Sequence, residues 1–320
     1  MAASMAFGGL CLQKPGKSAL MAPPRPFFSI IIPTYKRPQQ LANCLHALQR
    51  LNYPRTDFEV VIVNDGWDHP LDAVTAPFRD TLTITLLQQP NAGPAAARNF
   101  GAAHATGRIL AFTDDDCMPA VNWLAALAER FHRLPHHLVG GHTLNALVEN
   151  TYSSTSQAII EVVYAYYNAN PADARFFASN NLAVSADGFR SLGGFDATFR
   201  TSEDRDFCDR WLQRGYLMTY APEVLVYHAH ALGFGSFWKQ HFAYGRGAWR
   251  YHTARARRGS GRFRPDMRFY LSLLQYPFGR NREAKATRLL LTLLLAQTAN
   301  AAGFLRQGMT QLRLPRAADK

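Results

Sequence analysis

Three consecutive carboxylates, Asp114, Asp115 and Asp116, directly follow the apolar run 108–112. Adjacent acids repel one another, so a folding chain gains nothing by holding them at the tip of a buried strand. The cluster becomes favourable when a divalent cation, with the phosphates that the cation carries, neutralises it. The plainer interpretation is a solvated acidic loop that caps a helix, because acids favour a helix start and Pro119 is a helix opener. The elements around the triplet decide between these two interpretations.

Short apolar runs of the first half of the chain predict four strands, at 28–33, 58–63, 82–87 and 108–113. Between them, helices are predicted to begin at Pro38 and at Pro94, and Gly107 suits the end of the second helix. Strands that alternate with helices predict an α/β fold, with a mostly parallel sheet and helices on both of its faces.

Polar side chains follow three of these strands at the point where each strand ends. Tyr35 follows the first strand, Asp65 follows the second, and the acidic triplet follows the fourth. Ligands of such sheets bind outside the carboxyl ends of the strands. One polar residue after a strand is ordinary loop chemistry, but three sets at the same edge predict a site.

The second half of the chain has a looser pattern. It contains a predicted strand at 175–184, a glycine turn at 193–195 and a last buried strand at 224–228 that ends in His228. Between the last two, Glu203 and Asp204 open a predicted helix. Acids in the first turn of a helix are also favoured by the helix dipole, so part of this second acidic cluster could be capping alone.

Seven motifs in order resemble the nucleotide-sugar-dependent glycosyltransferases of family 2. They are Ile30-Ile-Ile-Pro-Thr-Tyr35, Val61-Ile-Val-Asn-Asp-Gly66, Asn91-Ala-Gly-Pro-Ala-Ala-Ala-Arg-Asn99, Phe112-Thr-Asp-Asp-Asp116, Gly193-Gly-Phe195, Ser202-Glu-Asp204 and Val226-Tyr-His228. The resemblance covers about residues 28–230 and implies a GT-A type, Rossmann-like sheet. It departs from the family at Asn64, where family members often carry a first acid.

The resemblance implies a nucleotide pocket formed by Pro33, Thr34, Tyr35, Arg37, Asp65, Arg98, Asp114 and Asp115. Tyr35 is expected to place its ring against the base, and Asp65 is expected to accept the ring N–H of uracil, which favours UDP. Guanine also offers an N–H donor, so GDP and dTDP stay open. The plainer alternatives are a turn-forming aspartate before Gly66 and a helix-surface arginine at Arg98.

The resemblance also implies a metal site and a catalytic base. Asp116 is expected to hold Mn²⁺ or Mg²⁺, with Asp114 as the other acid of the Asp-x-Asp pair. His228 is expected to complete the metal site, although His230 lies two residues on and a histidine at a strand end can be purely structural.

The resemblance makes Asp204 the expected general base, with Glu203 as the fallback. A carboxylate can take the proton of an acceptor hydroxyl if its surroundings raise its pKa and the acceptor lies within hydrogen-bond reach. Asp206, further along the helix, is expected to be solvated or paired with an arginine. Three residues are expected to line the acceptor side: Ser179, Asn180 and Asn181. Trp211 could simply belong to the core.

The predicted function is an inverting, hexosyltransferase-type transfer from a UDP-sugar to a hydroxyl acceptor, in cell-surface polysaccharide or glycolipid synthesis. A nucleotidyltransferase is the nearest alternative, but the loop 33–38 lacks its glycine-rich sequence. A dehydrogenase is disfavoured because no Gly-x-Gly-x-x-Gly follows a strand. A non-enzymatic nucleic-acid- or membrane-binding protein that uses the basic C-terminal segment remains the alternative of a different class.

Charge and composition divide the 320 residues into three predicted parts: a flexible tail at 1–26, a GT-A catalytic domain at 27–230 and a basic, aromatic-rich helical region at 231–320. The last region holds 17 Lys and Arg against 3 Asp and Glu, whereas the rest of the chain is close to neutral. Scattered cysteines and the absence of a signal-like start favour a reducing compartment. We therefore expect a cytoplasmic enzyme that attaches peripherally to the inner face of the membrane through 231–320, with a saccharide or lipid-linked acceptor and no nucleic-acid partner.

Overall fold

The computed structural model describes residues 26–280 and 283–312. The tail predicted at 1–26 lies outside these ranges except for Pro26. The described strands are β1 (Phe28–Thr34), β2 (Phe58–Asp65), β3 (Ile84–Gln89), β4 (Ile109–Thr113), β5 (Cys117–Pro119), β6 (Leu138–Asn145), β7 (Asn181–Ser185) and β8 (Met218–His228). The α-helices are α1 (Pro38–Leu48), α2 (Asp72–Thr75), α3 (Pro94–His104), α4 (Trp123–Arg133), α5 (Thr151–Tyr167), α6 (Ala186–Leu192), α7 (Glu203–Gln213), α8 (Phe234–Arg257), α9 (Met267–Arg280) and α10 (Glu283–Leu312).

The described strands form one mixed sheet in the order β3-β2-β1-β4-β7-β6-β8-β5. The first four strands in this order are parallel, as the sequence predicts. β7 then pairs antiparallel with both β4 and β6, and β5 pairs antiparallel with β8. The sheet is therefore α/β with helices on both faces, but only one half of it is purely parallel.

Alternating side chains of the buried strands form two cores, one on each face of the sheet. Ile30 and Ile32 of β1 pack with α1 and α4, whereas Ile31 packs on the other face with α3, α6 and α7. Trp211 belongs to this second core and is 1% exposed, so its plain interpretation as a core residue is confirmed.

The element boundaries differ from the predictions at four main places. β8 begins at Met218, six residues before the strand predicted at 224–228. β3 begins at Ile84 and not at 82, because the Leu82 amide donates to the Phe78 carbonyl and closes a turn. α3 ends at His104, and Gly107 serves a close approach instead, since a Cβ there would lie 2.5 Å from the Ser29 nitrogen. The strand predicted at 175–184 is paired only from Asn181 to Ser185, because residues 175–180 form a loop.

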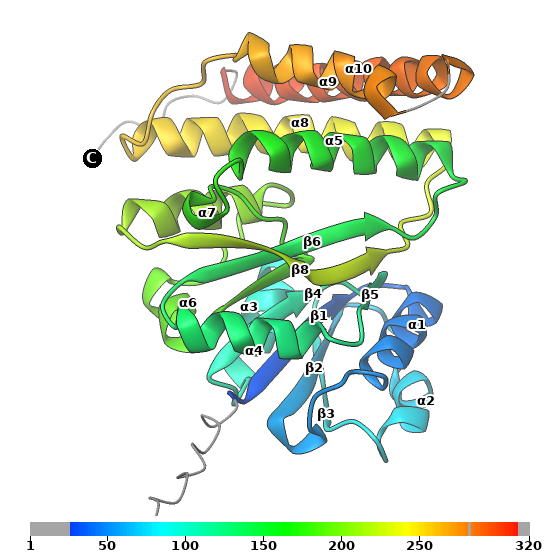
Figure 1. Cartoon of the computed structure of the whole chain (residues 1–320), viewed down its shortest axis with the longest axis vertical. Helices are drawn as coiled ribbons and strands as arrows, with labels where there is room; N and C mark the ends of the chain where they lie inside the picture. Colours follow the sequence, from blue (N-terminus) through cyan, green and yellow to red (C-terminus); the bar gives the residue numbers. More distant parts are fainter. Residues whose placement is uncertain (1–25, 281–282, 313–320) are drawn as a thin grey trace, which may run out of the picture.

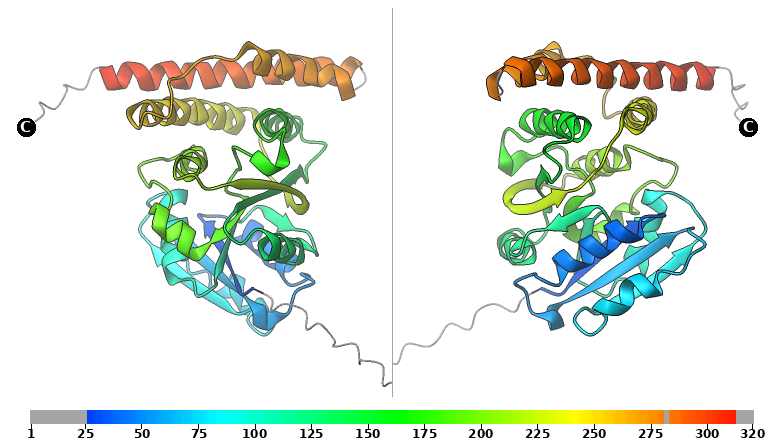
Figure 2. Two further views of the ribbon diagram at one scale, coloured as in Figure 1. Left: turned by 60° about the vertical axis from the view of Figure 1, so that its left-hand side comes forward. Right: turned by 90° about the vertical axis from the view of Figure 1, so that its right-hand side faces the viewer.

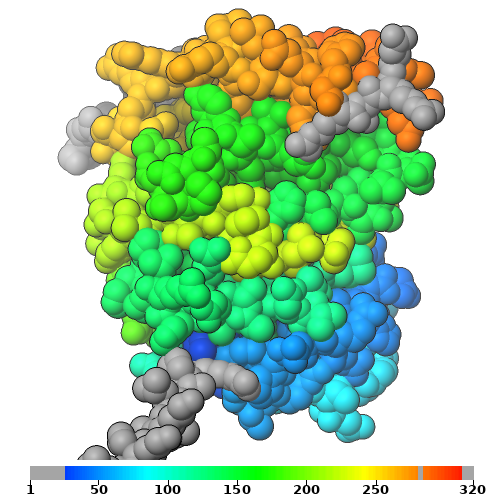
Figure 3. Space-filling view, viewed as in Figure 1, coloured from blue at the N-terminus to red at the C-terminus, as the bar shows by residue number. Residues whose placement is uncertain are grey.

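The helices α5, α8, α9 and α10 form a layer above the sheet (Figure 1). α8 and α10 lie side by side, and glycines permit their close approach. A Cβ on Gly245 would lie 1.9 Å from the Asn300 carbonyl oxygen, and one on Gly303 would lie 1.9 Å from that of Phe242. Figure 2 shows α10 running along the outer side of this layer. In the space-filling view of Figure 3, the same helices form the top of the molecule.

Arginines near the end of α8 tie the layer to the catalytic part of the chain. Arg258 donates to Asp206 and to Asp209 of α7, at 2.7 and 2.9 Å. Asp206 is fully buried and also accepts from Arg210, so of the two expectations for this residue, the pairing with arginine is the one observed. Part of the basicity of 231–320 is thus used inside the protein.

Candidate active site

The acidic triplet lies at the turn between β4 and β5, at the carboxyl end of β4. The pairing of β5 with β8 sets Cys117 opposite His228, although 111 positions separate these two residues in the sequence. This pairing brings the histidine to the triplet. The strand pairing, and not the local sequence, therefore assembles the site.

The three acids point to different partners, which relieves their mutual repulsion. Asp114 accepts from Arg98 at 2.6 Å. Asp115, which is buried, accepts from Thr34 at 2.7 Å and from Arg37 at 3.2 Å. Asp116 accepts from the same Arg37 at 2.9 Å. Burial and its acidic neighbours still raise the pKa of Asp115 to about 6, against the lowering effect of Arg37.

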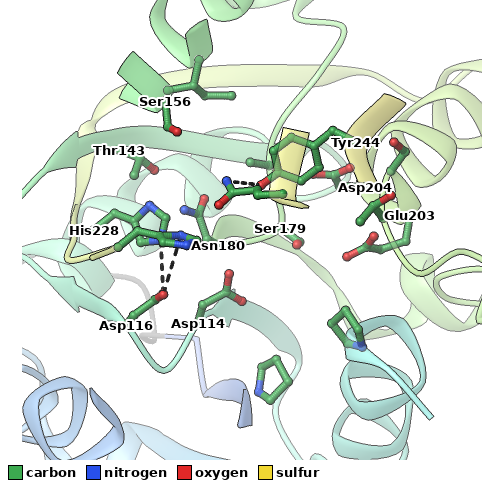
Figure 4. A pocket seen from close by; sticks show the side chains of 18 of the residues that line it. Asp114, Asp116, Thr143, Ser156, Ser179, Asn180, Glu203, Asp204, His228 and Tyr244 are labelled. Atoms are coloured by element: carbon green, nitrogen blue, oxygen red, sulfur yellow. Dashed lines mark hydrogen bonds and ion pairs between the residues drawn. The ribbon is translucent and has the colours of Figure 1, made fainter. Parts of the chain in front are cut away.

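Asp116, His228 and His230 form a cluster whose ligand atoms all lie within 4.8 Å of one another. His228 Nε2 lies 3.2 Å from Asp116 Oδ1, and His230 Nδ1 lies 3.9 Å from Asp116 Oδ2 (Figure 4). Burial opposes the charge of Asp116, but His228 and Arg37 together hold the pKa of its carboxyl well below the usual range. Burial and the charge of His228 lower the pKa of His230 to about 4, so its imidazole is neutral at pH 7.

This donor set fits a divalent transition metal. One carboxylate and two imidazoles suit Mn²⁺ better than Mg²⁺, which prefers oxygen ligands. Both histidines that the sequence left as alternatives are brought to Asp116. Asp114, predicted as a further ligand, is not part of this three-residue cluster and bonds Arg98 instead. Its metal role stays a prediction.

Arg98 joins the two acidic motifs of the sequence. Its guanidinium donates to Asp114 at 2.6 Å and to Glu203 at 2.9 Å, and the residue is 3% exposed. Because Glu203 is held in this ion pair, it is a weaker candidate for the base than its neighbour.

Asp204, the other carboxylate of this motif, forms no ion pair with a described residue. It accepts only the amide of Arg205, at 2.8 Å. Burial, followed by the charge of Glu203, raises the pKa of Asp204 to about 7. A carboxyl with this pKa can exchange a proton near neutral pH, as general acid–base chemistry requires.

The loop before α7 is held by α8. Ser202 adopts a left-handed conformation with φ of 69°, which is unusual for a residue other than glycine. Gly247 of α8 faces it so closely that a Cβ there would lie 2.2 Å from Thr201 Oγ1 and 2.7 Å from Ser202 Oγ. A strained backbone supported by tight packing is typical of functional sites.

At the far end of the site, Tyr35 is half-exposed after β1, and Asp65 is buried at the end of β2. The Asp65 carboxylate accepts four hydrogen bonds, from the Gln89 and Asn91 side chains and from the amides of Ala92 and Gly93. The bond from Asn91, at 3.3 Å, is the longest of the four. A contact from a base N–H would have to replace one of these donors, because a carboxylate offers about four acceptor positions.

All of these residues line one cavity of about 710 Å³, within the usual range for ligand sites. Every residue predicted to bind the nucleotide, hold the metal or act as the base borders it: Pro33, Thr34, Tyr35, Arg37, Asp65, Arg98, Asp114, Asp115, Asp116, Glu203, Asp204 and His228. Ser179 and Asn180 border it too. Asn181 is not among its lining residues, since its amide bonds Trp123 and the His142 and Val224 carbonyls inside the sheet.

The cavity continues further than the sequence predicts. Its upper chamber, as we name it, is lined from β6, α5, α8 and α10 by Thr143, Asn145, Ser153, Ser156, Gln157, Ile159, Ile160, Val163, Gln240, His241, Tyr244, Gln297 and Asn300. No motif marks these positions. Their one signal is the recurrence of polar residues at helical spacing inside largely apolar helices.

Comparison with solved structures gives the fold of the protein. The mannosyltransferase PcManGT from Pyrobaculum calidifontis, solved with GDP-Man and Mn²⁺, has a TM-score of 0.59 at 20% identity, over 92% of this chain and 82% of that one. Staphylococcus aureus TarS 1-349 with UDP-GlcNAc has a TM-score of 0.52 at 15% identity, over 91% and 93%. The fold is therefore GT-A, the fold of nucleotide-sugar-dependent glycosyltransferases.

The sequence comparisons narrow this class to one family. The family model described as glycosyl transferase family 2 matches residues 29–192. Glycosyltransferase AglE from Haloferax volcanii is 31% identical over 229 residues, which cover 69% of this chain and 73% of that protein. A pre-mycofactocin glycosyltransferase from Mycobacterium tuberculosis is 30% identical over 59% of this chain and 41% of its own length.

The chain belongs to glycosyl transferase family 2, and it is a nucleotide-sugar glycosyltransferase. The resemblance and the enzyme class expected from the sequence are confirmed. The non-enzymatic and nucleotidyltransferase alternatives are not supported.

Proposed function

We propose that this enzyme transfers a sugar from a UDP-sugar to an acceptor hydroxyl with inversion at the anomeric carbon. One observation carries the proposal: a metal-type cluster and a carboxyl with a pKa near 7 border the same cavity. The two chemistries that such a transfer needs, charge stabilisation at the leaving group and proton removal at the acceptor, are thus available together.

In this proposal Asp116, His228 and His230 would hold Mn²⁺, and the bound ion would supply positive charge that stabilises the diphosphate leaving group. The GDP-Man and Mn²⁺ complex of the similar mannosyltransferase supports this choice of ion. Arg37, which bonds Asp115 and Asp116, is close enough to share the diphosphate charge. Arg98 holds Asp114 and Glu203 in place and acts as a positioning residue.

Asp204 takes the proton of the acceptor hydroxyl as its oxygen attacks the anomeric carbon of the sugar. The bond from the sugar to the diphosphate breaks, and nucleoside diphosphate leaves. Burial favours this role, because a carboxylate of raised pKa is a stronger base than an exposed one.

UDP is favoured over GDP because Asp65 suits the ring N–H of uracil and Tyr35 offers an exposed ring for stacking. Asn91, the donor of the longest bond to Asp65, is the one that uracil would replace. TarS, solved with UDP-GlcNAc, supports UDP, whereas the mannosyltransferase supports GDP.

A screen of UDP-, GDP- and dTDP-sugars for Mn²⁺-dependent release of nucleoside diphosphate tests the proposal. We expect the fastest release from a UDP-sugar and no release in EDTA. Release from a GDP-sugar alone would contradict the choice of uracil as the nucleobase of the donor. Release from none of the donors would contradict the proposed function as a whole.

We further propose that the helical layer attaches the enzyme peripherally to the cytoplasmic leaflet. α9 exposes Leu271, Leu274 and Phe278, and α10 exposes Leu291 and Leu305. The stretch Ala284–Gln311 is long and apolar enough to cross a membrane by length and composition, and 22% of its most apolar part is buried. Because α10 packs along α8, we favour an interfacial position for it, with exposed arginines near anionic lipid. A saccharide or lipid-linked acceptor for cell-envelope polysaccharide synthesis is consistent with that position.

A further inference from the structure

Among the described residues that line the cavity, four buried polar atoms besides Arg98 Nε have no hydrogen-bond partner. They are Thr143 Oγ1, Ser156 Oγ, Asn180 Oδ1 and His241 Nε2. Three of these residues are more than nine-tenths buried, and His241 is only 3% exposed. A buried polar group without a partner costs about 1–3 kcal/mol, so native proteins retain few of them without a reason.

The four atoms come from separate elements, yet they all border the one cavity. Thr143 belongs to β6, Ser156 to α5, His241 to α8, and Asn180 directly precedes β7. Figure 4 shows Thr143, Ser156 and Asn180 above the acids Asp114 and Asp116. Because these two hydroxyls, one amide and one imidazole border the same cavity, we interpret them as groups that can hydrogen-bond a polar ligand.

The upper chamber carries no formal charge. All of its described lining residues are neutral polar, aromatic or aliphatic, apart from His241. Burial, with a smaller contribution from His230, lowers the pKa of His241 to about 4, so its imidazole is neutral at pH 7. A phosphate group in this chamber would find no cation among the described lining residues, whereas the hydroxyls of a sugar can both donate and accept there.

The chamber also lies next to the proposed base. Tyr244 of α8 borders the same cavity as Asp204 and Glu203 (Figure 4). Tyr244 accepts a hydrogen bond from Gln240 at 2.9 Å, so two bonded polar side chains of α8 line this part of the cavity. A hydroxyl compound in the chamber is therefore within reach of Asp204.

We propose that the upper chamber, together with Asn180 of the same cavity, is the acceptor site and that it selects a neutral sugar through Thr143, Ser156, Asn180 and His241. This proposal rests on the proposed function and deepens it by naming the class of acceptor. The attacking hydroxyl then belongs to a saccharide, and a phosphate-terminated lipid is excluded from the chamber. If the acceptor is lipid-linked, its sugar and not its phosphate occupies this part of the cavity.

The test uses the full chain, the best donor of the nucleotide-sugar screen and simple acceptor probes. The probes are the p-nitrophenyl glycosides of glucose, galactose, mannose and N-acetylglucosamine, with farnesyl phosphate as the counter-probe. Transfer products are measured by mass spectrometry. The variants are His241→Leu, Ser156→Ala and Thr143→Val.

Two matched controls separate ligand recognition from the removal of a buried polar atom. His252 Nδ1 on α8 and Ser260 Oγ are also buried without a partner, but neither residue borders the cavity. His252→Leu and Ser260→Ala therefore make the same substitutions as His241→Leu and Ser156→Ala, but at positions outside the cavity.

We expect transfer to at least one p-nitrophenyl glycoside, and a rise of about 3- to 10-fold in the acceptor KM for each chamber variant, the usual effect of one lost hydrogen bond. UDP binding and donor hydrolysis should stay unchanged, and the controls should match the wild type.

Three results would overturn the proposal: transfer to farnesyl phosphate alone, transfer to none of the probes by an enzyme that hydrolyses its donor, or chamber variants with the acceptor KM of the controls. The last result means that ordered water satisfies the four atoms. Absence of donor hydrolysis is a different outcome, because it contradicts the proposed function and this inference together.

Discussion

The two ends of the cavity treat their polar groups in opposite ways. At the acidic edge, Asp114, Asp115 and Asp116 each have a basic partner within 3.2 Å, whereas the upper chamber leaves neutral groups such as His241 Nε2 unpaired. A buried charge without a partner is far more costly than a buried hydroxyl without one. The charged groups of the acidic edge therefore need partners even without a ligand, whereas the neutral groups of the chamber can stay unpaired until a ligand binds.

Removal of the proposed base should have the largest effect. Asp204→Asn keeps the shape of the side chain but cannot take a proton, so we expect transfer to fall about 10²- to 10⁴-fold. UDP binding should be unchanged, because this residue is not expected to contact the nucleotide. Steady-state kinetics and UDP titration measure the two quantities. The control is Asp187→Asn, an exposed carboxylate on α6. Equal activity of the two variants would remove Asp204 from the mechanism.

The pairing at the acidic edge can be broken at Arg98. Arg98→Leu leaves Asp114 and Glu203 without their shared partner, so we expect the free energy of unfolding to fall by about 3–5 kcal/mol. Arg190→Leu breaks an exposed ion pair with Asp187 and should cost less than about 1 kcal/mol. Urea denaturation compares them, and similar losses would show that the edge is not organised by Arg98.

The pH dependence of kcat/KM should reflect the titration of the Asp204 carboxyl. The pKa of Asp204 is raised from 3.8 to about 7, and the base must be unprotonated, so kcat/KM should rise about tenfold per pH unit up to pH 7 and level off above it. The sign for stability is opposite. Between pH 4 and 7 the folded state binds more protons at this residue than the unfolded state does, so its contribution falls as pH rises. A rate that does not change between pH 5 and 7 contradicts this assignment.

The smallest effect should appear at the helical layer. Replacement of Leu271 and Leu274 by serine removes exposed apolar surface from α9, so we expect binding to phosphatidylglycerol vesicles to weaken by about tenfold. Activity on soluble acceptors should not change. Val121→Ser is the control, since it removes an exposed apolar side chain far from that layer. Vesicle sedimentation measures the difference, and equal binding by all three proteins would argue against peripheral attachment.

The sequence predicts the acidic edge far better than the chamber. β1, β2 and β4 are continuous apolar runs, and the polar residues after them stand at one edge of a parallel sheet for topological reasons. The sequence does not predict β6, because Gly140 and Gly141 interrupt the apolar pattern after Leu138 and Val139. They are glycines because a Cβ on Gly140 would lie 1.9 Å from the Phe177 ring.

The chamber could not be predicted because its residues meet only through tertiary packing. Ser156, His241 and Asn300 lie on three helices and share no motif. The sequence predicts Asn181 on the acceptor side with Ser179 and Asn180, yet β7 directs it into the sheet, where its side chain accepts a hydrogen bond from Trp123. Polar residues repeated at helical spacing within an apolar helix were the available signal, and that pattern does not say which helices come together.

Calorimetric titration of UDP with and without Mn²⁺ tests the central claim most directly, which is that the acidic edge binds a nucleoside diphosphate through a metal at Asp116. We predict Mn²⁺-dependent binding by the wild type and by the surface control Asp80→Ala, and loss of the Mn²⁺ dependence in Asp116→Ala. Equal UDP affinity of the wild type in Mn²⁺ and in EDTA, or an Asp116→Ala variant that still responds to Mn²⁺, would contradict the claim.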